Sequence, residues 1–193
     1  MAEEKFNQQK ISNLIRNGLT LRYDPTQKTP LPILSSNDFL PLKESLNIDF
    51  IEKNLTDSIY KKFDNSSTKD ITIALSGGVD STLILGLLRQ TIPDLKINAV
   101  SIKFAESKDE TLEAKKIADF FEAEHEVIQL ENYLLELPAA INILGLPFWD
   151  IHWYYIAKYA KTKSSHLASG DGGDELFGGY TFRYSKFLSL TKP

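Results

Sequence analysis

Residues 71–82 read Ile-Thr-Ile-Ala-Leu-Ser-Gly-Gly-Val-Asp-Ser-Thr. The first five residues are apolar or β-branched, which is typical of a strand buried on both faces. The next three, Ser76-Gly77-Gly78, favour a tight turn because glycine has no Cβ. From Val79 onward apolar residues recur at helical spacing, at Leu83, Leu87 and Leu88. The stretch therefore predicts a strand, a glycine turn and the start of a helix.

A turn of this kind is a common anion site. Free backbone N–H groups and the positive end of the helix dipole meet at one point, and the anion is most often phosphate. Ser76 and Ser81 can add hydroxyl donors, and Asp80 can hold a metal ion that bridges phosphate oxygens. The motif differs from the Gly-x-x-x-x-Gly-Lys-Ser loop because no lysine follows the glycines. The alternative interpretation is an ordinary strand-to-helix turn.

A second glycine-rich stretch lies nearer the C-terminus. Residues 167–180 read Leu-Ala-Ser-Gly-Asp-Gly-Gly-Asp-Glu-Leu-Phe-Gly-Gly-Tyr. We expect His166-Leu167-Ala168 to end a strand, and the glycines that follow would let backbone amides approach a nucleotide. Asp171, Asp174 and Glu175 add carboxylates, which are useful opposite cations or an incoming amine.

The two motifs resemble those of known families. Residues 76–81 are similar to the Ser-Gly-Gly-x-Asp-Ser motif of the ATP pyrophosphatases, the PP-loop family. Residues 167–180 resemble the signature of its asparagine synthetase class of amide ligases, and weaker similarity extends over about residues 48–184. The resemblance implies an ATP-dependent, AMP-forming amide ligase. Such an enzyme adenylates a substrate carboxylate, releases pyrophosphate and passes the acyl group to ammonia or an amine.

The resemblance also implies roles for particular residues. Asp80 and Asp174 would hold Mg²⁺ against the pyrophosphate, and Asp171 would lie nearer the incoming amine, so these three acids are the candidate catalytic residues. The phosphates would bind between Ser76 and Ser81, and the adenosine further along the same site. The candidate ATP-binding residues are Leu75, Ser76, Gly77, Gly78, Asp80, Ser81, Thr82, Val100, Ser169 and Gly170.

The order of expected elements predicts an α/β fold. Strands near 71–75, 97–103, 125–129 and 165–168 alternate with helical segments, which predicts a doubly wound parallel sheet of about five strands. Helices would cover both faces through right-handed crossovers, in the manner of the adenine nucleotide alpha hydrolases that the motifs resemble. Ligands of such sheets bind beyond the carboxyl ends of the strands, where both glycine motifs fall.

The chain divides into two parts on this interpretation. Residues 1–46 form an N-terminal extension and a proline-rich connector, with an amphipathic helix, or a helix and an edge strand, over 7–21 that Gly18 interrupts. Residues 47–193 form the PP-loop synthetase domain. It opens with a helix from Asn47 to about Phe63, which ends in a turn over 64–67.

Composition excludes several classes of function. A net charge of −4, with scattered Lys and Arg, argues against a nucleic-acid binder. The absence of cysteine excludes disulfides, zinc thiolate sites and a cysteine glutaminase within this chain. No apolar run reaches the ~20 residues that span a bilayer, and the first residues do not resemble a signal peptide. We therefore expect a cytoplasmic enzyme that does not insert in membranes.

Aromatic residues and histidines outside the motifs have two interpretations. An aromatic stripe at helical spacing over 148–159, including His152, Trp153 and Ile156, is most often core packing and otherwise a pocket wall or a subunit contact. His125 matches a histidine common in the family, and a hydrogen-bonded structural role is at least as well supported. The three histidines are too dispersed for a zinc site, and the lysines of 158–163 are expected on a solvated helix face.

Two departures from the family pattern leave alternatives open. Gly145-Leu146 precedes Pro147 where the family has acidic residues, and the loop after Asp150 is short, so aspartate as the substrate is in doubt. The chain also ends at Pro193, before the usual C-terminal helical region. It is then a fragment, a reduced member, or a subunit completed by a partner such as a separate glutaminase, a C-terminal-region protein or a second copy. The competing hypothesis is a nucleotide-binding or regulatory module.

Overall fold

The computed structural model describes residues 7–20, 47–64, 69–105, 109–144 and 150–182, together with 185 and 189. The elements in chain order are α1 (Gln8–Thr20), α2 (Ile48–Asp64), β1 (Asp70–Ala74), α3 (Val79–Thr91), β2 (Lys96–Phe104), α4 (Thr111–Phe120), β3 (Glu124–Leu130), a 3-10 helix η2 (Tyr133–Glu136), α5 (Leu137–Leu144), α6 (His152–Lys163), β4 (Leu167–Ala168) and α7 (Gly173–Phe177).

The strands form one parallel sheet in the order β3-β2-β1-β4. Ile73 of β1 pairs with Ala99 of β2 on one side and with Ala168 of β4 on the other. The predicted strand positions are confirmed, although the described residues hold four strands where about five were expected. The direction of winding reverses at β1, because β2 and β3 lie to one side of it and β4 to the other. The carboxyl ends of β1 and β4 are therefore the topological switch point, where such sheets bind ligands.

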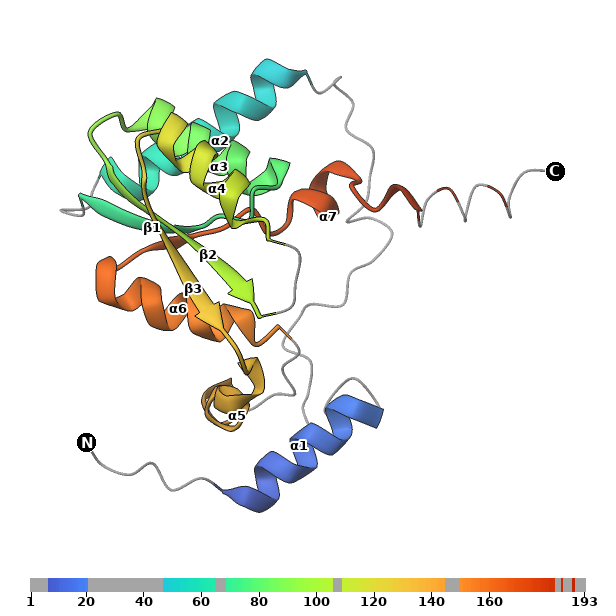
Figure 1. The fold of residues 1–193 in the computed structure, drawn as a ribbon. Coiled ribbons are helices and arrows are strands. Elements are labelled where there is room, and N and C mark those ends of the chain that lie inside the picture. The colour runs from blue at the N-terminus through green and yellow to red at the C-terminus, as the bar shows by residue number, and fades with distance from the viewer. Residues whose placement is uncertain are drawn as a thin grey trace.

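Helices cover both faces of the sheet, as predicted (Figure 1). Helices α3 and α4 lie on one face, and α2 packs on the outside of α3, whereas α6 lies on the opposite face against β1 and β2. The crossovers from β1 to β2 and from β2 to β3 run in one direction along the sheet, and the crossover from β3 to β4 runs back. When all of them have the same hand, their helices lie on opposite faces. The doubly wound α/β fold follows directly from the strand order.

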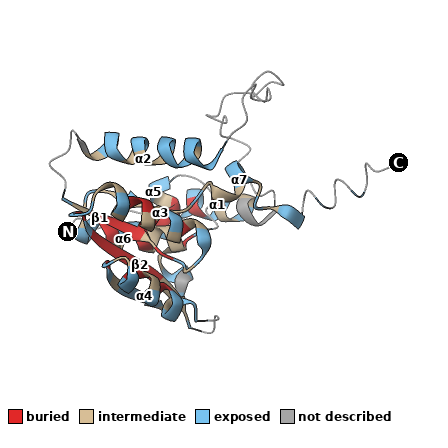
Figure 2. Cartoon of the chain, turned by 90° about the horizontal axis from the view of Figure 1, so that it is seen from above, coloured by how far each residue is buried: buried red, intermediate tan, exposed pale blue. Residues whose placement is uncertain are grey.

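The core is centred on β1, as the apolar run in the sequence predicts. Ile71, Thr72 and Ile73 are all buried, so both faces of this strand are covered. Figure 2 shows the buried residues concentrated in the strands and in the helix faces turned toward them, while the outer side of α2 is exposed. Each aliphatic side chain buried in this way contributes about 1.5–3 kcal/mol to folding.

The N-terminal helices agree only partly with the sequence interpretation. Asn47 caps α2, since its side chain accepts a hydrogen bond from the Phe50 N–H at 2.7 Å. Helix α1 runs to Thr20, so the prediction that Gly18 interrupts it, or that an edge strand follows within it, is wrong. A helical glycine costs only about 1 kcal/mol, and Ile11 and Leu14 offset this by packing on α5. The connector over 21–46 and the turn residues 65–67 lie outside the described part.

One guanidinium ties the end of α3 to two loops. Arg89 donates from Nε to the Phe121 carbonyl and from Nη2 to the Glu122 carbonyl, both at 2.9 Å. Its Nη1 donates to the Leu95 carbonyl at 3.0 Å and to the Pro93 carbonyl at 2.5 Å. Glu122 has a φ of 54°, in the left-handed region that a non-glycine residue rarely adopts. The planar, five-donor fork of arginine therefore fixes the turns that precede β2 and β3.

We expect Arg89→Met to lower the free energy of unfolding by about 2–3 kcal/mol, because charged hydrogen bonds to several carbonyls are lost at once. Arg89→Lys should recover only part of this, since one ammonium cannot serve the same four carbonyls. Lys116→Met, which removes a single exposed ion pair on α4, is the matched control and should change stability by less than about 0.5 kcal/mol. Urea unfolding measures all three. Equal effects at Arg89 and Lys116 would contradict this role.

Candidate functional site

The turn between β1 and α3 is built as the sequence predicts. Gly77 has a φ of +80°, which favours glycine, and Gly78 precedes the first residue of α3. The Ser76 and Ser81 hydroxyls lie 3.1 Å apart, and the Gly78 N–H donates to Ser76 Oγ at 3.2 Å. Thr82 Oγ1 donates to the Gly78 carbonyl at 2.7 Å. These contacts hold the turn in one shape at the N-terminus of a helix.

The second glycine motif packs directly on the first. A Cβ atom at Gly170 would lie 2.5 Å from the Ser81 nitrogen and 2.7 Å from the Asp80 carbonyl carbon. A Cβ atom at Gly173 would lie 2.6 Å from Asp80 Oδ1. A side chain at Gly170 would collide with backbone atoms, and one at Gly173 would displace the Asp80 side chain, so the glycines allow the segment after β4 to contact the start of α3. The two motifs, which are far apart in the sequence, therefore form one site.

A first cavity of about 310 Å³ opens at the carboxyl ends of the strands. Residues of α6, chiefly His152, Trp153 and Ile156, close one side of it, and β2 supplies another side. Most of the predicted ATP-binding residues meet here. Those that line the first cavity are Leu75, Ser76, Asp80, Ser81, Val100, Ser169 and Gly170, together with the predicted catalytic residue Asp171.

A second cavity of about 470 Å³ adjoins the first and shares Asp80, His152, Trp153, Gly170 and Asp171 with it. Asp174 and Asp80 both line this second cavity, so the two acids share one cavity as the two motifs predict. Its other lining residues are Asp150, Gly172, Gly173, Glu175 and Tyr180. Among the described residues that line it, five carry carboxylates and none is a lysine or an arginine.

Three predicted residues belong to the same turn but line neither cavity. Gly77, Gly78 and Thr82 line a separate groove along α3, with Leu83 and Phe121 among its other residues. The structure brings the rest of the predicted set together around the two cavities.

Several lining residues were missed from the sequence. Ser101, Ile102 and Phe104 follow Val100 on β2, and Glu110 and Thr111 stand at the start of α4. The sequence could have indicated these residues, because they lie at or shortly after the carboxyl end of a predicted parallel strand. Within the aromatic stripe, Ile156 is buried and also lines the first cavity with His152 and Trp153, so the pocket-wall interpretation holds for these members. Phe148 and Trp149 lie outside the described residues.

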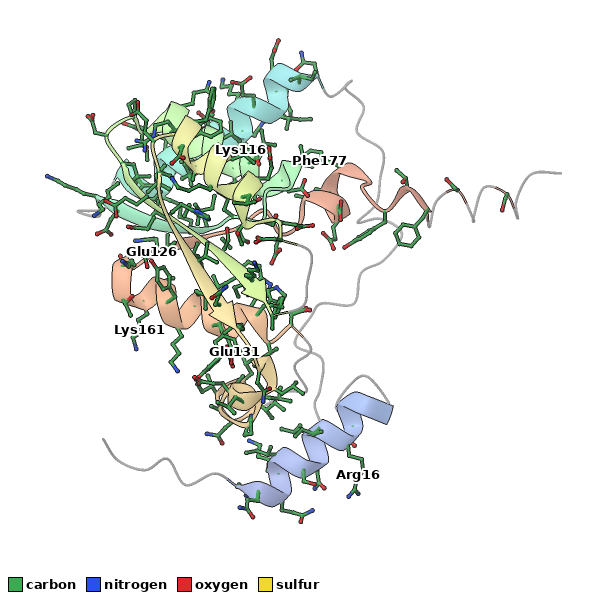
Figure 3. All side chains as sticks on the ribbon, viewed as in Figure 1. Arg16, Lys116, Glu126, Glu131, Lys161 and Phe177 are labelled. Atoms are coloured by element: carbon green, nitrogen blue, oxygen red, sulfur yellow. The ribbon has the colours of Figure 1, made fainter. Side chains whose placement is uncertain are left out.

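The lysines of α6 are exposed, as expected from the sequence, and two of them form ion pairs. Lys158 Nζ lies 2.6 Å from Glu136 Oε1, and Lys163 Nζ lies 2.5 Å from Glu126 Oε1. Figure 3 shows Glu126 on β3 beside the end of α6. The paired carboxylates raise the pKa of both lysines. Exposed pairs of this kind add little stability, and α6 is positioned chiefly by its packing on β1 and β2.

A further ion pair lies at the rim of the first cavity. Lys103 Nζ, near the end of β2, lies 2.5 Å from Asp109 Oδ2. Asp109 Oδ1 accepts from the Thr111 N–H at 3.0 Å and from the Thr111 hydroxyl at 2.5 Å. The hydrogen bond from Lys103 and those from Thr111 lower the pKa of Asp109 to about 2. The contact joins β2 to the start of α4.

The described residues contain no cluster of three or more His, Cys, Asp or Glu side chains placed to hold a metal ion by themselves. A divalent ion near Asp80 and Asp174 would need further oxygen ligands from a bound molecule or from water. Over the same described ranges, no helix is long and apolar enough to cross a membrane.

Comparison with known proteins places the chain in a family. Residues 51–193 match the family described as asparagine synthase. A Bacillus subtilis relative, named asparagine synthetase 1 (glutamine-hydrolyzing), is 35% identical over 152 residues, which are 75% of this chain and 24% of that protein. The chain therefore belongs to the asparagine synthase family, as the two motifs indicated. It spans about a quarter of the length of the curated relatives it matches.

Solved structures confirm the fold class. A glutamine-dependent NAD⁺ synthetase from Acinetobacter baumannii, solved with ADP, gives a TM-score of 0.52 at 16% identity over 73% of this chain and 29% of that chain. An NH3-dependent NAD synthetase from Campylobacter jejuni, solved with a nitrate ion, gives a TM-score of 0.50 at 20% identity over 70% of this chain and 61% of that chain. At these identities the likeness concerns the α/β fold alone.

We expect Gly170→Ala to separate the two motifs, because its methyl group would collide with backbone atoms of Asp80 and Ser81. Overpacking of this kind should lower the free energy of unfolding by about 1–3 kcal/mol and displace the amide NMR signals of Asp80 and Ser81. Gly172→Ala is the control. Its methyl group meets no atom, so only the strain of its φ of +94° applies and those two signals should stay in place. Unshifted signals in Gly170→Ala would contradict the packing.

The depressed pKa of Asp109 predicts a pH dependence. Its folded-state pKa of about 2 lies below the ordinary value of about 3.9. The ionised Asp109 carboxylate therefore adds to the free energy of unfolding above pH ~4, and this contribution is lost as the pH falls toward 2. Lys103→Met should raise the pKa of Asp109, because the largest cause of the depression is removed. A carboxyl-carbon NMR titration of the two proteins measures this. An unchanged pKa in the variant would show that Lys103 is not the cause.

Proposed function

We propose that this chain binds ATP at the paired cavities and is the adenylating part of an AMP-forming amide ligase. The observation that carries the proposal is the packing of the second glycine motif on the first, which joins both around one 310 Å³ cavity at the switch point of the sheet. Membership of the asparagine synthase family supports the same conclusion.

The first turn suits the phosphates of ATP. Its backbone bends at Gly77 and leads into a helix of 13 residues, so the positive end of the helix dipole lies just after the carboxyl end of β1. Ser76 and Ser81 line the cavity with hydroxyl groups. In the proposal the adenosine lies near Leu75, Val100 and Gly170.

The carboxylates suit Mg²⁺, which takes oxygen ligands and is usually held by one or two carboxylates together with phosphate oxygens and water. Asp80 and Asp174 line the same cavity and would be the two protein ligands. The absence of a larger cluster among the described residues fits an ion that arrives with its nucleotide. When bound, Mg²⁺ would neutralise charge on the leaving pyrophosphate.

The reaction would proceed in two displacements. A substrate carboxylate oxygen attacks the α-phosphorus of ATP, the bond to the β-phosphate oxygen breaks, and pyrophosphate leaves. Ammonia or an amine then attacks the acyl carbon of the adenylate, loses a proton, and AMP departs with the bonding electrons. The second cavity would receive the ammonia or amine, because it adjoins the first through Asp80, Gly170 and Asp171 and its carboxylates attract hydrogen-bond donors and cations. Asp171, which lines both cavities, would meet the amine.

We expect Asp80→Asn and Asp174→Asn each to slow adenylation by roughly 10²–10⁴ while the fold is retained. The loss corresponds to the several kcal/mol of charge stabilisation that the metal ion supplies, at 1.36 kcal/mol per tenfold. Exchange of labelled pyrophosphate into ATP, measured over a panel of carboxylic acids at low Mg²⁺, reads this step alone. Asp57→Asn, an exposed acid on α2 away from both cavities, is the matched control.

The outcomes separate two functions. Loss of exchange in both variants, with Asp57→Asn unaffected, supports the ligase assignment. Retention of most exchange in either variant would show that its carboxylate does not hold the ion. Binding of ATP without exchange for any acid, even with candidate partner proteins, would favour a nucleotide-binding module instead.

A further inference from the structure

We propose that His125 is a positioning residue, which fixes the first glycine turn through a hydrogen-bond chain that crosses three strands. His125 Nε2 on β3 lies 2.8 Å from Ser101 Oγ on β2. The Ser101 hydroxyl donates to the Leu75 carbonyl at 2.6 Å, directly after β1. The chain therefore runs from the edge strand to the residue that enters the turn.

The chemistry of the serine sets the direction of each bond. A hydroxyl has one hydrogen, and Ser101 uses it on the Leu75 carbonyl oxygen, which can only accept. The short contact to His125 then requires the imidazole to donate from Nε2–H. The neutral ring accordingly carries its proton on Nε2, and Nδ1 is unprotonated.

The surroundings of His125 favour this neutral form. The ring is half-buried, and burial lowers its pKa, with the nearby positive charge of Lys115 acting in the same direction. Asp119, on the same helix α4, acts in the opposite direction and has the smaller effect. The neutral ring with its proton on Nε2 thus agrees with the hydrogen-bond geometry.

The planarity of the peptide bond carries the effect into the turn. The Leu75 carbonyl and the Ser76 N–H belong to one rigid peptide unit, so a bond that holds the carbonyl also sets the direction of the N–H. That N–H donates across the turn to Ser81 Oγ at 3.3 Å. Ser81 is the first buried residue of α3. His125 therefore acts at a distance on two residues that line the first cavity.

The free protein offers a direct test. His125→Leu removes the donor, whereas His125→Gln keeps an N–H donor at a similar reach. We expect His125→Leu to displace the amide NMR signals of Ser76 and Ser81, and His125→Gln to leave them close to their original positions. Gln129→Ala is the control and should not move them, because Gln129 is an exposed residue on the same face of β3 that pairs with Lys103 and not with Ser101.

A second measurement concerns the nucleotide, and its meaning rests on the proposed function. By calorimetry with Mg²⁺–ATP, we expect His125→Leu to weaken binding about 3–10-fold, as for the loss of one hydrogen bond, and His125→Gln to stay within about twofold of the original. In the Ser101→Ala protein, His125→Leu should cause no further loss of ATP affinity, because the hydrogen-bond chain from His125 to the turn is already broken at Ser101.

Each outcome decides between the alternatives. Displaced Ser76 and Ser81 signals, rescue by glutamine and a non-additive double variant support the positioning role. Unmoved signals, or an undiminished effect of His125→Leu in the Ser101→Ala protein, would overturn it. If the original protein binds no ATP, the proposed function fails, while the amide signals of the free protein still decide the role of His125.

Discussion

The backbone at Gly170 lies against the backbone at Asp80 and Ser81, and the arrangement of the site depends on this contact. A single Cβ atom at Gly170 would fall within 2.5 Å of the Ser81 nitrogen. Such an approach is open only to glycine, because any side chain would push the two segments apart. The contact brings the loop after β4 over the start of α3, and Asp80 lines both cavities.

The rest of the fold holds this contact in place. Strand β1 is buried on both faces and pairs with β2 and β4, so the two turns leave the sheet at adjacent positions. Helix α6 supplies a cavity wall and packs on β1 and β2, while Lys158 and Lys163 form ion pairs on its exposed side. The Ser101 hydroxyl adds an internal support beneath the first turn. Hydrophobic burial thus fixes the sheet, and a few polar contacts fix the direction of its loops.

Local features of the sequence were the most predictable. Residues 71–82 predicted a strand, a glycine turn and the start of a helix, and residues 167–180 predicted the end of a strand followed by a glycine-rich turn; the structure has these features, and it adds the short helix α7, which was not predicted. The alternation of elements predicted the parallel, doubly wound sheet. Features set by tertiary packing were not predictable. Helix α1 continues through Gly18 because it packs on α5, and the lysines of α6 are exposed as predicted but also pair with carboxylates of other segments. The packing of Gly170 on Asp80 likewise depends on residues that only the fold brings together.

The central claim is that the two glycine motifs form one ATP site. Titration of the isotopically labelled chain with Mg²⁺–ATP, followed by amide NMR signals, tests it most directly. We predict that signals from Ser76–Ser81 and from Ser169–Asp171 shift together and give a single dissociation constant. Shifts confined to one motif, or two motifs that titrate with different dissociation constants, would contradict the claim.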